Sequence, residues 1–307
     1  MSETVLRARQ LTKRYNRHLA LDRIDLTVRK GSIYGFIGQN GAGKSTLMRI
    51  AAGLAHPTSG SVELFGASEG AKLVTARRRI GTTIETPALF PHLSATENLE
   101  IYRLQQGIRN RSRIRETLSL VGLADTGSKK SAEFSMGMKQ RLGLAIALMS
   151  EPDMLILDEP TNGLDPLGVV ELRELLRGLN RETGLTILIS SHILSELDQM
   201  ATDYGFIHQG RMLEQLSASE LQTKCRQYLH IKVDNPELAL SVIRKGLLSA
   251  EYELEPDGSI RLYGGFKRAG SVSSLLFSAG LEIEQFTPVG EQLERYFSRL
   301  IGGAAYA

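Results

Sequence analysis

A glycine-rich loop between a predicted strand and a predicted helix constrains this chain more than any other feature. It follows the apolar run of residues 32–37, and its residues are Gly38, Gln39, Asn40, Gly41, Ala42, Gly43, Lys44, Ser45 and Thr46. The glycines let successive backbone amides converge on phosphate oxygens, and the start of the following helix adds partial positive charge. Lys44 is placed to reach the β- and γ-phosphates, and the hydroxyl of Ser45 to ligate Mg²⁺. The loop therefore predicts a nucleotide site that includes all nine residues.

Two carboxylates stand at the end of a second apolar strand. Residues 154–157 are Met-Leu-Ile-Leu, and Asp158 and Glu159 follow directly. Fully apolar strands are typical of a buried parallel sheet, and open α/β sheets bind ligands at the carboxyl ends of their strands. Asp158 is therefore predicted to ligate Mg²⁺, and Glu159 to polarise the attacking water as a general base. The alternative is an acidic strand end that only faces solvent.

The order of the predicted elements indicates an α/β protein with two domains. Strand and helix patterns alternate through residues 1–216, with an inserted helical unit at about 87–150, which predicts a doubly wound core with a helical subdomain. Residues 217–307 change to the order β-α-β-β-α-β, which is typical of a small ferredoxin-like α+β domain. A length of 307 residues favours two domains of ordinary size.

Composition excludes several other classes of protein. The single cysteine, Cys225, excludes a disulfide framework and a cysteine-based zinc site, and it favours a reducing compartment. No apolar run approaches the roughly 18 residues that a membrane span needs, the longest being residues 142–149. The net charge of +3 is too small to argue for nucleic acid. We therefore expect a cytosolic protein that crosses no membrane alone and binds no nucleic acid.

A third motif lies just ahead of the carboxylate strand. Residues 134–141 read Phe-Ser-Met-Gly-Met-Lys-Gln-Arg, a serine N-cap before a predicted helix. Following the glycine-rich loop and preceding Asp158, it resembles the signature motif of the ATP-binding cassette (ABC) family, and the resemblance covers about residues 4–216. The Asn-Lys-x-Asp sequence of a GTPase is absent. The resemblance implies a P-loop ABC cassette that binds ATP and Mg²⁺ and hydrolyses ATP.

The resemblance implies roles for five further residues. Tyr15 resembles the aromatic residue that stacks on adenine, and His192 resembles the switch histidine that hydrogen-bonds the γ-phosphate. Ser135 and Gly137 resemble the groups that touch the γ-phosphate bound by a partner subunit. Asp165 ends a Gly-Leu-Asp segment that resembles the dimer-contacting D-loop. The implied assembly is a homodimer of two copies head to tail, with ATP between them.

Three residues depart from the usual pattern of the family. Glu85 stands where the family usually has glutamine, and it is expected to take part in catalysis and to contact Mg²⁺ or its water. Met136 and Met138 stand where the signature usually has glycine and glutamine, and Met138 cannot copy the hydrogen bonds of an amide. Glu85 with this signature resembles the bacterial subfamily that exports bacitracin and lantibiotics, or gives producers immunity. The alternative for Glu85 is a solvated loop carboxylate.

The resemblance implies the ATP-hydrolysing subunit of a bacterial exporter of a peptide antibiotic or other amphiphilic compound. Because no span is predicted, we expect a separate membrane permease, with this chain at the cytoplasmic face of the membrane and the helical unit near Glu85 as docking surface. Two alternatives stay open. A non-transport ABC ATPase, which remodels ribosomes or acts on nucleic acid, usually joins two cassettes or carries a long coiled-coil insertion. An importer ATPase would more often end in a small β-barrel.

Overall fold

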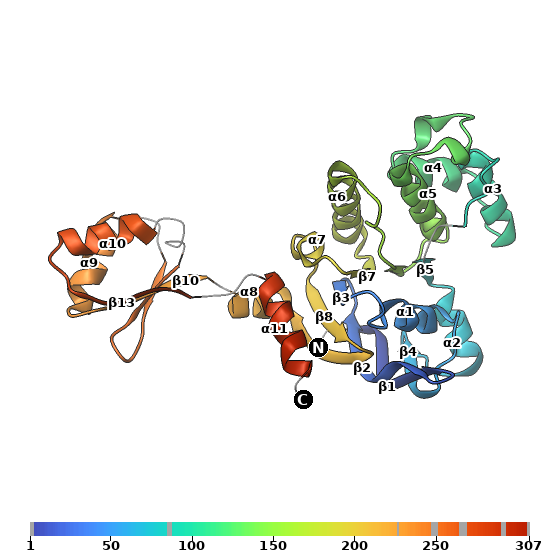
Figure 1. The fold of residues 1–307 in the computed structure, drawn as a ribbon. Coiled ribbons are helices and arrows are strands. Elements are labelled where there is room, and N and C mark those ends of the chain that lie inside the picture. Colours follow the sequence, from blue (N-terminus) through green and yellow to red (C-terminus); the bar gives the residue numbers. More distant parts are fainter. Residues whose placement is uncertain are drawn as a thin grey trace. The chain divides into compact units, whose positions relative to one another are not determined.

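The computed structural model describes residues 3–84, 88–225, 227–246, 251–263, 269–289 and 293–305 (Figure 1). The chain divides into two compact units, Met1–Ala218 and Ser219–Ala307. Among the described residues, none of the helices combines the length and the apolar character that crossing a bilayer requires.

A six-stranded sheet forms the centre of the first unit. Its strands lie in the order β5 (Ile80–Thr83), β6 (Met154–Leu157), β7 (Thr186–Ser191), β3 (Ile33–Ile37), β8 (Asp203–His208) and β9 (Arg211–Ser217). The first five are parallel, and β9 pairs with β8 antiparallel. Every residue of β3, β6 and β7 is buried, because the sheet is covered on both faces. The carboxyl ends of β3, β6 and β7 therefore come together at one edge of the sheet.

A second, three-stranded antiparallel sheet shares the core of this unit. Its order is β2 (His18–Arg29), β1 (Thr4–Tyr15) and β4 (Ser59–Leu64). Side chains of both sheets and of helix α1 (Lys44–Ala52) form one buried cluster, which includes Leu26, Phe36 and Met48. The helix that follows the glycine-rich loop is therefore fixed by the main hydrophobic core.

The remaining helices of the first unit include the inserted helical segment. They are α2 (Gly70–Arg77), α3 (Ala95–Gln105), α4 (Ser112–Leu120), α5 (Met136–Leu148), α6 (Pro166–Thr183) and α7 (Leu194–Asp198). Helix α3 begins with a capping box, in which Ser94 and Glu97 exchange hydrogen bonds. Helix α5 packs so closely on β5 that a Cβ atom at Gly81 would lie 2.2 Å from the carbonyl oxygen of Ala147. The apolar run of residues 142–149 is thus a core helix face, as its buried side chains confirm.

The second unit holds a four-stranded antiparallel sheet. Its elements, in chain order, are α8 (Ala218–Cys225), β10 (Tyr228–Val233), α9 (Pro236–Gly246), β11 (Tyr252–Leu254), β12 (Ile260–Tyr263), α10 (Ala269–Ser278), β13 (Ile283–Val289) and α11 (Leu293–Ala305). The strands lie in the order β11-β12-β10-β13. Helices α9 and α10 cover one face of the sheet (Figure 1). Ile243 and Leu276 of these helices belong to one buried cluster with Leu229 and Ile231 of β10. The unit therefore has a hydrophobic core of its own.

Candidate functional site

The glycine-rich loop connects β3 to α1, as the sequence predicts. Gly41 and Gly43 have φ values of 80° and 111°, a backbone region that favours glycine. A Cβ atom at Gly43 would lie 2.7 Å from the carbonyl oxygen of Ala20, so the loop could not keep this path with a larger residue. Within the part of the chain that the structure describes, no side chain caps the N-terminus of α1. The first amides of that helix are therefore available to an anion such as phosphate.

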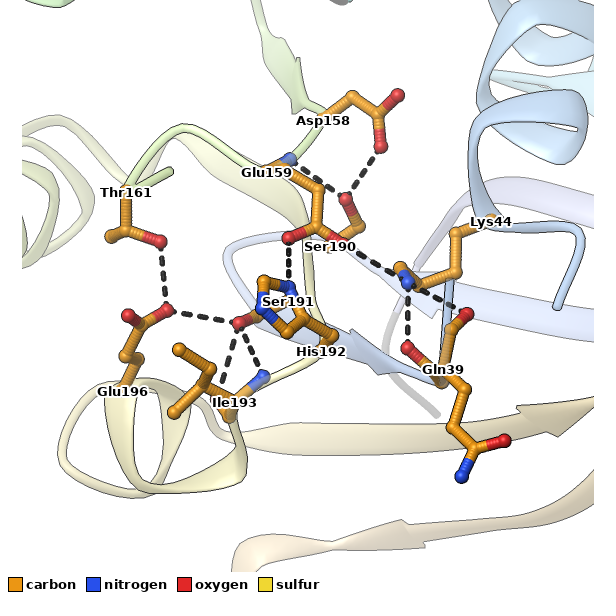
Figure 2. A network of polar contacts seen from close by, with 11 residues as sticks. Gln39, Lys44, Asp158, Glu159, Thr161, Ser190, Ser191, His192, Ile193 and Glu196 are labelled. Atoms are coloured by element: carbon orange, nitrogen blue, oxygen red, sulfur yellow. Dashed lines mark hydrogen bonds and ion pairs between the residues drawn. The ribbon is translucent and has the colours of Figure 1, made fainter. Parts of the chain in front are cut away.

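Lys44 is buried at the centre of the site, with 5% of its side chain exposed. Its Nζ atom donates to the carbonyl oxygens of Gly38 at 2.6 Å and Gln39 at 3.2 Å. The same atom lies 3.0 Å from Oε1 of Glu159 (Figure 2). The ammonium group is thus held by the loop that carries it and by the carboxylate at the end of β6.

Asp158 and Glu159 occupy the end of β6 and share a contact to Ser190 in β7. The Ser190 hydroxyl donates to Oδ1 of Asp158 at 2.7 Å and accepts from the backbone N–H of Glu159 at 2.8 Å (Figure 2). Glu159 adopts a φ of 49°, which is uncommon for a residue with a side chain and marks a constrained position. Ser190 thereby fixes both carboxylate residues to the neighbouring strand.

His192 completes a line of three charged or polar groups. Its Nδ1 atom lies 2.6 Å from Oε2 of Glu159, whose other oxygen contacts Lys44. An ionised carboxylate only accepts hydrogen bonds, so Nδ1 carries the hydrogen in this pair. Burial alone would raise the pKa of Glu159, but hydrogen bonds and charge from Lys44 and His192 outweigh it and hold the pKa below its usual value. Glu159 is therefore ionised at neutral pH, the state that a general base requires.

A second network lies beside this line and was missed by the sequence reasoning. Oε2 of Glu196, on α7, accepts from the hydroxyl of Thr161 at 2.7 Å and from that of Ser191 at 2.9 Å (Figure 2). Ser190 was missed as well. The available signal was a pair of serines that follows the apolar run Ile-Leu-Ile in β7, immediately before His192.

The predicted signature residues also belong to the first unit, where they line a different cavity from the Lys44 site. Ser135 is the N-cap of α5, where its hydroxyl accepts from the backbone N–H of Met138 at 3.3 Å. Asp165 is the N-cap of α6 and accepts from the N–H of Gly168 at 2.9 Å. Ser135, Gly137 and Asp165 line one cavity of about 530 Å³. The structure thus brings these three predicted residues together, but apart from the line formed by Lys44, Glu159 and His192.

The remaining predicted residues differ in how far they are exposed to solvent. Tyr15 ends β1 with 41% of the residue exposed, and the Nζ atom of Lys13 lies 4.7 Å from its ring centroid. Gln39, Asn40 and Gly41 are exposed, Ala42 is buried, and Ser45 and Thr46 are half-buried in the first turn of α1. Glu85 lies outside the described residues.

A divalent cation fits the donors that the site offers. The Ser45 hydroxyl and the Asp158 carboxylate are oxygen donors, which Mg²⁺ prefers. Asp158 is buried, with 7% of the residue exposed, and Oδ1 of its carboxylate is oriented by Ser190. Burying a carboxylate requires a compensating partner, and a cation beside it would supply one.

These features define a P-loop nucleoside triphosphatase, and comparison with known proteins identifies its family. The family profile described as "ABC transporter" matches residues 21–162. The chain is 41% identical to the bacitracin transport ATP-binding protein BcrA of Bacillus licheniformis, over 98% of each chain. It is 44% identical to the lantibiotic transport ATP-binding protein SrtF of Streptococcus pyogenes, over 68% of this chain and 89% of SrtF.

A solved structure agrees with this assignment. The dimeric post-hydrolysis state of the ATP-binding cassette MJ0796, bound to ADP and Pi, superposes with a TM-score of 0.63 at 26% identity. The match covers 69% of this chain and 98% of MJ0796. The chain belongs to the ABC transporter family, as an ATP-binding protein that hydrolyses ATP. The family and the ATPase activity that the sequence predicts are confirmed, as is the P-loop cassette fold.

Proposed function

We propose that this chain is the ATP-hydrolysing subunit of a bacterial exporter of a peptide antibiotic or other amphiphilic compound. It acts at the cytoplasmic face of the membrane and drives a separate membrane permease. The similarity to BcrA extends over 98% of both chains and so includes the second unit. The longest helix of the inserted segment, α5, has 13 residues, which disfavours the long coiled-coil insertion of ribosome-remodelling relatives.

One observation carries the proposed mechanism: the carboxylate of Glu159 contacts both Lys44 and His192. On ATP binding, Lys44 donates to the β- and γ-phosphate oxygens and the amides at the start of α1 bind the phosphates. Glu159 accepts a proton from a water molecule whose oxygen bonds to the γ-phosphorus. The bond from that phosphorus to the bridging oxygen breaks, and ADP leaves with the electron pair. His192 hydrogen-bonds the γ-phosphate during this step.

Mg²⁺ belongs to the same proposal. Ser45 and Asp158 would hold it, together with Glu85 directly or through water. When bound, the cation supplies neutralisation of phosphate charge. Ser190 keeps the Asp158 carboxylate oriented for this purpose. Tyr15, whose ring is exposed at the end of β1, would stack on adenine.

The catalytic unit is proposed to be a head-to-tail homodimer with ATP between the two copies. Ser135 and Gly137 of one copy would contact the γ-phosphate held by the glycine-rich loop of the other. Asp165 would contact the partner beside them. The cavity that these three residues line supports this arrangement, because it places the signature and D-loop segments on one surface.

The chain is proposed to consist of a catalytic cassette and an accessory domain. Residues 1–216 form the cassette, and its helical segment at about 87–150 docks on the permease. Residues 217–307 form an accessory domain of ferredoxin-like type, supported by the sheet order β11-β12-β10-β13. This domain stabilises the dimer or gates hydrolysis. Truncation after residue 216 that leaves dimerisation, ATPase rate and transport unchanged would argue against both roles.

Purification of the tagged chain from membranes tests the exporter proposal. We expect a membrane protein to co-purify in a defined ratio, and expression of both to raise resistance to a bacitracin-type peptide. The same pair carrying Lys44→Ala is the control and should give no resistance. Co-sedimentation with ribosomes, without a membrane partner, would contradict the proposal.

A further inference from the structure

We propose that Glu196 is a positioning residue that ties the Thr161 segment to the segment that carries His192. The inference rests on the roles proposed above for Glu159 and His192. The carboxylate of Glu196 fixes the distance between these two segments. Glu159, His192 and the segment that ends at Asp165 therefore move together.

A single oxygen atom makes the connection. Oε2 of Glu196 accepts from Oγ1 of Thr161 at 2.7 Å and from Oγ of Ser191 at 2.9 Å (Figure 2). Thr161 and Ser191 are buried, with 7% and 1% of their surfaces exposed. Because one acceptor serves two buried hydroxyls, Glu196 sets their separation, and Thr161 cannot shift far without losing this contact.

Thr161 and Ser191 each lie close in sequence to a proposed functional residue, Glu159 and His192 respectively. Thr161 lies two residues after Glu159, in a turn where the N–H of Asn162 donates to the carbonyl of Glu159 at 3.0 Å. A second turn overlaps it and ends directly before Asp165, because the N–H of Leu164 donates to the carbonyl of Thr161 at 3.1 Å. Since Thr161 belongs to both turns, a shift of Thr161 would move both.

The contact to Ser191 fixes the other segment. The Ser191 hydroxyl also accepts from the backbone N–H of Ile193 at 2.9 Å, so it links the backbone on either side of His192. Its one hydrogen lies between two acceptors, Oε2 of Glu196 at 2.9 Å and the carbonyl oxygen of Ile193 at 3.1 Å. Glu196 thus holds the residue before His192, and through it the residue after. The direction of the imidazole toward Glu159 follows from this backbone.

Helix α7 does not need Glu196 to keep its place. Leu194 and Leu197 anchor it in the core, with 4% and 1% of each residue exposed. Glu196 is only half-buried, on the side of the helix that meets Thr161 and Ser191. Removing its carboxylate should therefore loosen the two loops more than it destabilises the fold.

The kinetics of Glu196 variants of the full chain test the proposal. A displacement of about 1 Å in a catalytic group can reduce turnover about 100-fold. We expect Glu196→Ala to lower kcat for ATP by about tenfold to 100-fold, with the Kd for a non-hydrolysable ATP analogue within about threefold of wild type. Glu196→Gln should restore most of kcat, because an amide oxygen can accept both hydroxyl hydrogen bonds. Ser195→Ala, an exposed change on the same helix, is the matched control.

A double-mutant cycle tests whether Glu196 acts through Thr161. Thr161→Val removes the hydroxyl at nearly constant volume, and Thr161→Ser keeps it. Combining Thr161→Val with Glu196→Ala should lower kcat less than the product of the two single effects, because both remove the same contact. If Glu196→Ala fails to fold, Thr161→Val against Thr161→Ser carries the same test, with a loss of kcat expected only for Val.

Several outcomes would overturn the inference. They are an unchanged kcat for Glu196→Ala, a Glu196→Gln variant as slow as Glu196→Ala, a parallel loss of analogue affinity, or strictly multiplicative effects in the cycle. The proposed function fails on a different result, namely full turnover by Glu159→Gln. A slow Glu159→Gln variant beside a fully active Glu196→Ala variant would remove only the inference.

Discussion

The Nζ atom of Lys44 lies 3.0 Å from the carboxylate of Glu159, so the lysine proposed to bind phosphate pairs with the proposed general base. A triphosphate would offer Lys44 a stronger negative partner than one carboxylate. We therefore expect nucleotide binding to separate the two side chains and to leave Glu159 for the attacking water. The pair also keeps a largely buried ammonium group compensated until a nucleotide arrives.

Replacement of Lys44 tests the phosphate contact. A hydrogen bond to a charged group contributes about 1.5–3 kcal/mol, so Lys44→Ala should weaken ATP binding by about tenfold to 100-fold. Calorimetric titration of the full chain with MgATP measures this loss. Lys72→Ala, on the exposed side of α2, is the control. Equal ATP affinity in Lys44→Ala and wild type would overturn the assignment of the loop.

Replacement of Ser190 tests the coupling of Asp158 to the neighbouring strand. Ser190→Ala leaves one carboxylate oxygen and the N–H of Glu159 without their partner, and a buried unpaired group costs about 1–3 kcal/mol. We expect a loss of unfolding free energy in that range and a higher Mg²⁺ concentration for half-maximal ATPase. Urea unfolding and a Mg²⁺ titration measure the two effects, with Ser195→Ala as control. A variant with normal stability and normal Mg²⁺ dependence would show that Ser190 does not orient Asp158.

The capping box of α3 predicts a pH-dependent contribution to stability. The backbone N–H of Ser94, its hydroxyl and Lys130 hold the pKa of Glu97 at about 2, below the usual 4.5. The folded state therefore favours ionised Glu97. Its contribution is fully present above about pH 4.5 and is lost as the pH falls toward 2.

Thermal unfolding of wild type and Glu97→Gln measures this contribution. We expect wild type to be the more stable at pH 6, and the difference to shrink at pH 3. High salt should reduce the difference at pH 6, because the groups are at the surface. A difference that is constant across this pH range would contradict the assigned pKa.

Site residues could be predicted from the sequence where neighbouring residues form a recognisable motif. The loop from Gly38 to Thr46 carries its own turn and helix start, and Asp158 and Glu159 follow a strand of unambiguous pattern. Glu196 has no such local context, because its partner Thr161 lies 35 residues away and meets it only after β6 and β7 pair. For the same reason, no local pattern predicted that Lys44 would pair with Glu159.

A hairpin turn and a helix–strand contact show the same difference between local and long-range features. The turn at Gln209 and Gly210 can be predicted from sequence because a two-residue hairpin turn is specified by two adjacent residues. In the structure these residues have φ values of 45° and 78° and join β8 to β9. The contact of α5 with β5 could not be predicted in this way. It depends on the absence of a side chain at Gly81, which lies 66 residues before its neighbour Ala147. Packing between distant elements therefore set the limit of the sequence-based expectations.

Replacement of Glu159 tests whether this residue is the general base of a dimeric ATPase. ATP turnover and the ATP-dependent sedimentation of the full-length variant are measured together, with Glu174→Gln on the exposed face of α6 as control. We expect Glu159→Gln to bind ATP, to form a stable dimer with it and to turn over at least about 100-fold more slowly than wild type. Undiminished turnover by Glu159→Gln would show that Glu159 is not the general base.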